Sequence, residues 1–112
     1  NRLINSKEDF TQEQYDHMHQ MFELTDDALT QMNRILVGHR QDNDVNRSFN
    51  IETEINNYRN QLRSQNINDV NDHKYTYAVG TMYMDIIQEC EKLGDYVVNV
   101  VEARMGVRQQ DA

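Results

Sequence analysis

The fold is indicated first by residues 15–36, which read YDHMHQMFELTDDALTQMNRIL. Apolar or semi-apolar side chains recur there in alternating steps of three and four residues, at Tyr15, Met18, Phe22, Thr25, Leu29, Met32 and Leu36. This spacing places the side chains on one face of an α-helix. Because Ser6 or Thr11 can cap the start and Gly38 can end the helix, the pattern predicts one long amphipathic helix over about 7–38.

A second, shorter helix is predicted over about 48–65, where apolar residues again recur in steps of four and three, at Ile51, Ile55, Tyr58 and Leu62. The segments 39–48 and 65–72 on either side of it are rich in Asn and Asp and have no such period. Short polar side chains compete for backbone hydrogen bonds, so we expect both segments to be connectors.

The third predicted helix covers about 73–106. Its expected apolar face consists of Val79, Met82, Ile86, Leu93, Val97 and Val100, with Ala78, Cys90 and Val101 beside it. Gly80 and Gly94 lie inside this helix, where each costs about 1 kcal/mol relative to Ala. We therefore expect a packing reason for them, namely the close approach of a neighbouring helix.

The composition limits both the fold and the partners. A chain of 112 residues without proline suits a single all-α domain, and three amphipathic stripes predict an antiparallel three-helix bundle. Eleven basic against nineteen acidic residues give a net charge of −8, which disfavours nucleic acid as a partner. No apolar run is long enough to insert into a membrane, and the single Cys90 cannot form an intramolecular disulfide.

The most ordered polar pattern is EKLGDYVVNVVE, residues 91–102. On a helix, Glu91, Asp95, Asn99 and Glu102 lie within roughly 80° of one another, and this stripe points away from the expected apolar face. One interpretation is an ordinary solvated surface. The other is a site for a hard cation or a metal cluster, since clustered carboxylates repel one another unless a cation neutralises them.

Residues 91–102 resemble the signature of the PhoU family, which is usually written around ERIGDHAxNIAE. The matching positions are Glu91, Leu93, Gly94, Asp95, Asn99 and Glu102. A full PhoU protein repeats a three-helix unit twice, whereas this chain has room for one. In the companion motif on the second helix, Glu52 matches the acid but Asn56 replaces an Asp. Arg59 and Arg63 follow on the same face and could neutralise the carboxylates without a metal.

The single bundle with this variant motif is similar to the cytoplasmic C-terminal domain of bacterial sodium/phosphate cotransporters. That resemblance implies a non-enzymatic domain on the cytoplasmic side of the inner membrane, within a longer membrane protein. It would modulate phosphate transport by docking on the transmembrane domain of its parent chain or on a second copy, as a homodimer. The missing initiating Met agrees with this expectation.

Two other functions are open at this point. The alternative from the same resemblance is a metal-binding carboxylate bundle that holds iron or zinc and acts as a free-standing phosphate-signalling regulator. The third is a coiled-coil-like oligomerisation module, which the heptad spacing of the first helix favours.

Other patterns are weaker. Asp42, Asp44 and Asn46 imitate the start of a calcium-binding EF-hand loop, but Arg47 stands where glycine is needed. His17 and His19 are expected at the surface on different helix faces, and Cys90 is expected to be a buried thiol rather than a nucleophile.

Overall fold

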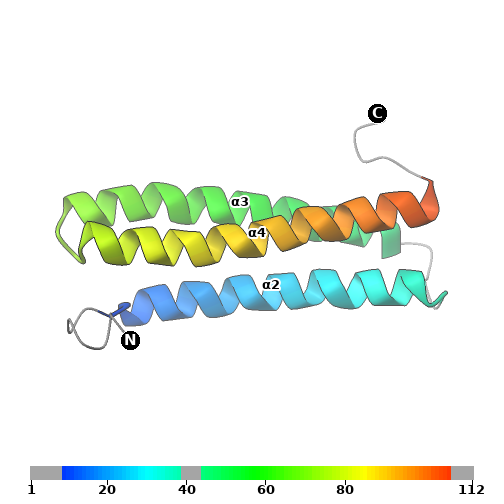
Figure 1. Ribbon diagram of the computed structural model, residues 1–112, viewed down its shortest axis with the longest axis horizontal. Helices are drawn as coiled ribbons and strands as arrows, with labels where there is room; N and C mark the ends of the chain where they lie inside the picture. Colours follow the sequence, from blue (N-terminus) through cyan, green and yellow to red (C-terminus); the bar gives the residue numbers. More distant parts are fainter. Residues whose placement is uncertain (1–8, 39–43, 107–112) are drawn as a thin grey trace.

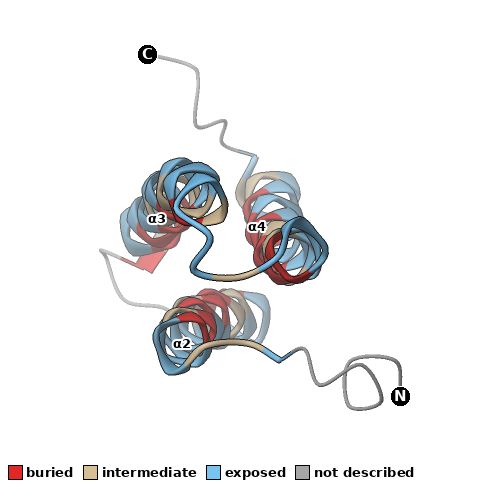
Figure 2. Ribbon diagram, turned by 90° about the vertical axis from the view of Figure 1, so that its left-hand side faces the viewer, coloured by how far each residue is buried: buried red, intermediate tan, exposed pale blue. Residues whose placement is uncertain are grey.

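The computed structural model describes residues 9–38 and 44–106, which form three long α-helices in up-down-up order (Figure 1). The helices are α2 (Gln12–Leu36), α3 (Asp44–Asn71) and α4 (Tyr77–Met105), and each contacts the other two. Viewed along the bundle, the buried residues face the centre (Figure 2). The described ranges contain no strand, so the predicted antiparallel three-helix bundle is confirmed.

The ends of α2 and α4 follow from local capping chemistry. Thr11 and Gln14 form a reciprocal capping box, in which the Thr11 hydroxyl accepts from the Gln14 amide at 3.1 Å. Thr76 caps α4 by accepting from the Val79 amide at 3.2 Å, and Gly106 ends it with a φ of 67°. The third helix therefore begins four residues later than the predicted residue 73, because His73, with a φ of 61°, lies in the preceding turn.

The second helix is much longer than predicted. Residues 44–48 and 65–71, expected to be connectors, belong to α3, while residues 39–43 lie outside the described ranges. The polar side chains near its end have tertiary partners instead of competing for the backbone: the Tyr75 hydroxyl donates to Asn66 at 2.8 Å, and Lys74 pairs with the buried Asp69 at 3.4 Å. These contacts stabilise helical backbone that the local sequence alone disfavours.

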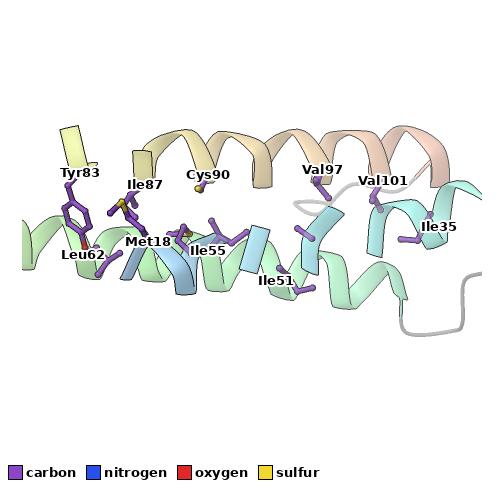
Figure 3. Packing of buried hydrophobic residues seen from close by; sticks show 12 residues of the cluster. Met18, Ile35, Ile51, Ile55, Leu62, Tyr83, Ile87, Cys90, Val97 and Val101 are labelled. Atoms are coloured by element: carbon purple, nitrogen blue, oxygen red, sulfur yellow. The ribbon is translucent and has the colours of Figure 1, made fainter. Parts of the chain in front are cut away.

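The core is a row of side chains along the bundle axis (Figure 3). It consists mainly of Met18, Met21, Ala28 and Ile35 from α2, Ile51, Ile55 and Leu62 from α3, and Tyr83, Ile87, Cys90, Val97 and Val101 from α4. None of the three described helices is long and apolar enough to cross a membrane.

The predicted core face of α4 is partly wrong. Val79 and Val97 are buried as expected, but Met82 and Leu93 are 42% and 45% exposed, and Ile86 and Val100 are only half-buried. The buried positions are instead Tyr83, Ile87, Gly94 and Val101, each one residue after a predicted position. Because Val79 and Val97 stay buried, the buried face is rotated toward these positions by somewhat less than the roughly 100° that one residue subtends on a helix.

The two glycines inside α4 explain this rotation. A Cβ added at Gly80 would lie 2.9 Å from atoms of Asn66 and Val70, and one added at Gly94 would lie 3.1 Å from Ile55. All three neighbours belong to α3. The glycine side of α4 therefore lies directly against α3, which confirms that both glycines serve close helix approach.

Truncation should distinguish the true core face from the predicted one. We expect Ile87→Ala to lower the free energy of unfolding by about 2–5 kcal/mol, because Ile87 is fully buried. Leu93→Ala should cost less than about 1 kcal/mol because Leu93 is half exposed. Urea unfolding of both variants measures the difference, and equal losses would contradict the observed orientation of α4.

A second expectation concerns Gly80. Gly80→Ala should lower the free energy of unfolding by about 1–3 kcal/mol despite the better helix propensity of alanine, since the new methyl group overlaps α3. The matched control is Thr81→Ala, one residue further on an exposed position. A Gly80→Ala variant as stable as this control would show that α3 and α4 are not in close contact here.

Candidate carboxylate site between α3 and α4

Three of the predicted site residues come together where α3 packs on α4. Glu52 on α3 and Glu91 and Asp95 on α4 each place a carboxylate oxygen within 4.8 Å of the others. Glu52 and Glu91 are each only 8% exposed, whereas Asp95 is exposed. The expectation that the whole acidic stripe points to solvent is therefore wrong for Glu91, because the rotation of α4 turns this residue toward α3.

Neutral and basic side chains surround the carboxylates. The Asn56 side-chain amide, one turn after Glu52, donates to the Glu52 carboxylate. The Gln88 amide donates to Glu91 Oε1 at 2.9 Å, and Arg59 Nη1 lies 4.0 Å from the same oxygen. Arg59 Nη1 also donates to the side-chain carbonyl oxygen of Gln88, Oε1, at 3.2 Å. Arg59, a possible charge partner in the sequence, thus lies beside the Glu91 carboxylate.

Gln88 is the residue that sequence reasoning missed. It links Arg59 of α3 to Glu91 of α4 through one amide group, which donates to the acid and accepts from the base. Gln88 stands three residues before Glu91 in the sequence, and residues with this spacing are neighbours on one side of a helix. This spacing is the sequence feature that could have predicted the contact.

The electrostatics of the site favour a proton or a cation near Glu91. Burial raises the pKa of the Glu91 carboxyl above its ordinary value, and the hydrogen bond to Asp95 and the charges of Asp95 and Glu52 raise it further. The Arg59 guanidinium acts in the opposite direction. Arg59 therefore offsets only part of the cost of holding this carboxylate in the helix interface.

The remaining predicted residues lie outside the cluster. Asn99 is exposed and Glu102 is half-buried, one and two turns further along α4 than Asp95. Arg63 is exposed, one turn beyond Arg59. The stripe read from the sequence is thus divided between a partly buried cluster and two residues, Asn99 and Glu102, that lie further along α4.

The donor set of the cluster consists of oxygen atoms from two Glu and one Asp, with neither His nor Cys among the clustered groups. Hard cations such as magnesium or manganese prefer such ligands, whereas protein zinc and iron sites generally include His or Cys. The cluster therefore fits a hard divalent cation better than the iron or zinc of the resemblance. A bound cation would compete with Arg59 for Glu91.

The other candidate residues are not members of the carboxylate cluster. His17 is half-buried, contrary to the expected surface position, with its Nδ1 atom 2.9 Å from the Tyr83 hydroxyl. His19 is exposed as expected and lies 3.5 Å from Glu23.

Cys90 is a buried free thiol, and burial raises its pKa, which disfavours the reactive thiolate. Asp44 and Asn46 of the EF-hand-like pattern belong to helix α3, while Asp42 lies outside the described residues.

The pKa of Glu91 predicts a pH dependence of stability. The folded protein holds a proton on Glu91 more tightly than the unfolded chain does, because the pKa of Glu91 is raised above its ordinary value of 4.5. Ionisation of Glu91 therefore destabilises the fold as the pH rises above about 4.5. Glu91→Gln keeps an oxygen acceptor for Gln88 but cannot ionise. We expect the variant to gain stability relative to wild type between pH 4.5 and 7, measured by thermal melting across that range. A constant difference in melting temperature at all pH values would contradict the raised pKa.

Comparisons with known proteins leave the family open, since no family model, no curated protein and no solved structure matches this chain.

Proposed function

We propose that this chain is a non-enzymatic, PhoU-like regulatory domain that modulates sodium-dependent phosphate transport. The observation that carries the proposal is the meeting of Glu52 and Asn56 with Glu91 and Asp95. These residues come from the two segments on which the resemblance to the PhoU family rests, and they share one site although they lie on different helices.

The arrangement of the cluster supports binding and regulation rather than a reaction. Glu91 of α4 contacts Arg59 of α3, so this acid takes part in a contact between the two helices. The Gln88 contact of Glu91 and the Asn56 contact of Glu52 each lie within one helix. A change in charge at this point alters the packing of two helices at once. The regulatory step in this proposal is a shift between helix arrangements with different affinities for the transporter's membrane domain.

Phosphate uptake by the transporter that carries this domain tests the proposal. We expect Asp95→Asn to change the response of uptake to the external phosphate concentration while leaving the melting temperature of the isolated chain nearly unchanged, because Asp95 is exposed. The matched control is Asp72→Asn, an exposed aspartate in the turn after α3. A normal response of the Asp95→Asn transporter would contradict the regulatory role of the cluster.

The alternative function is that of a metal-binding regulator, which the closeness of three carboxylates within 4.8 Å favours. In this case manganese(II), titrated into the metal-free chain and followed by calorimetry, should bind once per chain. Glu52→Gln should weaken binding about tenfold or more. Arg59→Met should strengthen it, because the variant removes a cation that lies 4.0 Å from Glu91. Weaker binding by Arg59→Met would show that the metal lies elsewhere.

A further inference from the structure

Two adjoining hollows lie along the surface of α2, the first of them between α2 and α3. The first has a volume of about 520 Å³, and its walls include Leu24 and Asp27 of α2 and Ile51 and Glu54 of α3. The second, of about 470 Å³, shares Leu24 and Asp27 with the first and continues along α2 to Phe22. Because they share a wall, the two hollows form one depression, here called the α2–α3 groove. It lies on the α2 side of α3, whereas the carboxylate cluster joins α3 to α4.

The base of the groove is apolar. Leu24 is half-buried and packs against the core, and Ile51 is only 6% exposed. Phe22, which lines the second hollow, is 49% exposed. Both hollows fall in the range of roughly 300–1,000 Å³ that is usual for binding sites in proteins. An apolar side chain of a partner therefore leaves water for an apolar contact when it enters the groove.

The charges around this base are mostly negative. Four acidic residues line the two hollows, namely Glu23, Asp26, Asp27 and Glu54, against one basic residue, Arg47. Acidic residues thus make up 4 of the 11 lining residues, compared with 19 of 112 in the whole chain. Negative charge is concentrated at the groove rather than spread evenly over the chain, so the groove attracts positive charge.

Most of these carboxylates have no internal partner that neutralises them. Within residues 9–38 and 44–106, Asp26, Asp27 and Glu54 form no hydrogen bond or ion pair. The Arg47 Nε atom instead lies 3.1 Å from the side-chain oxygen of Gln31, in the amide orientation that satisfies both neighbours of that glutamine. A cationic partner can therefore form ion pairs in the groove without breaking existing ones.

The spacing of the acids selects a partner with several separated positive charges. Glu23 and Asp27 stand one helical turn apart on α2, while Glu54 lies on α3. In the described part of the chain these acids form no group of three whose oxygen atoms meet within 4.8 Å, unlike the carboxylate cluster, so a single metal ion fits the groove poorly. A second copy of this chain also fits poorly, because its net charge of −8 is repelled by the same acids.

We propose that the α2–α3 groove binds a basic amphipathic segment of another protein. Lysine or arginine side chains of that segment pair with Asp27 and Glu54, and an apolar side chain between them packs on Leu24 and Ile51. The inference depends on neither the carboxylate cluster nor its proposed function, because no residue of the cluster lines the groove.

Fluorescence anisotropy with two labelled peptides tests the chemistry of the partner. One is a lysine–leucine peptide with the spacing of an amphipathic helix, and the other replaces each lysine by glutamate. We expect the chain to bind the lysine peptide at least about tenfold more tightly than the glutamate peptide, and to lose this preference as the salt concentration rises. Equal affinity for the two peptides, or no binding of the lysine peptide at low salt, would overturn the proposal.

Matched charge variants test the location. Asp27→Asn combined with Glu54→Gln should weaken binding of the lysine peptide about tenfold, because both charges line the groove. The control combines Asp72→Asn with Asp85→Asn, which removes the same charge from exposed positions outside the groove and should bind as wild type does. Equal weakening in the two double variants would reveal a general attraction to an acidic chain and would refute a site in the groove.

Phe22→Ser tests the apolar contact. It should weaken binding of the lysine peptide while the helical circular-dichroism spectrum stays unchanged, because Phe22 is half exposed. If the chain without peptide sediments as a dimer that Phe22→Ser dissociates, a second copy occupies the groove and the proposed partner is wrong.

Discussion

The close contact between α3 and α4 is the constraint on which the rest of the structure depends. Gly80 and Gly94 have no side chains of their own, so the α4 backbone at these positions lies directly against the side chains of Val70 and Ile55. A helix is rigid about its own axis, and fixing two points on one side fixes all the others. The burial of Glu91 and the exposure of Leu93 are both consequences of that single orientation.

The carboxylate cluster carries an electrostatic cost that an ordinary helix interface does not have. Burying an acid is unfavourable unless hydrogen bonds and an opposite charge compensate it, and the raised pKa of Glu91 shows that compensation is incomplete. Arg59 and Gln88 supply what compensation there is. An apolar residue at Glu91 would suit helix packing better, so packing alone does not explain the acid at this position.

The sequence predicted the fold well because periodicity reports amphipathic helices directly, as at Met18 and Ile55. It failed where the outcome depends on contacts between helices. The local composition around Asn66 and Asp69 favours a connector, but their contacts with Tyr75 and Lys74, which lie beyond the end of the helix, are not visible in the local sequence. The site was predicted in part: Glu52, Glu91 and Asp95 do meet, but their burial could not be read without the rotation of α4.

The apolar content of α4 explains why periodicity alone does not predict its orientation. Its apolar side chains cover more of the circumference than two neighbouring helices can bury, so periodicity alone gives two overlapping candidate faces. The face with Leu93 holds the larger apolar side chains, so periodicity favours it as the buried face. The face that touches α3 is marked by glycine instead, which contributes little to the hydrophobicity of a pattern. In a three-helix bundle each helix has one side without a neighbour, and on α4 that side holds the excess.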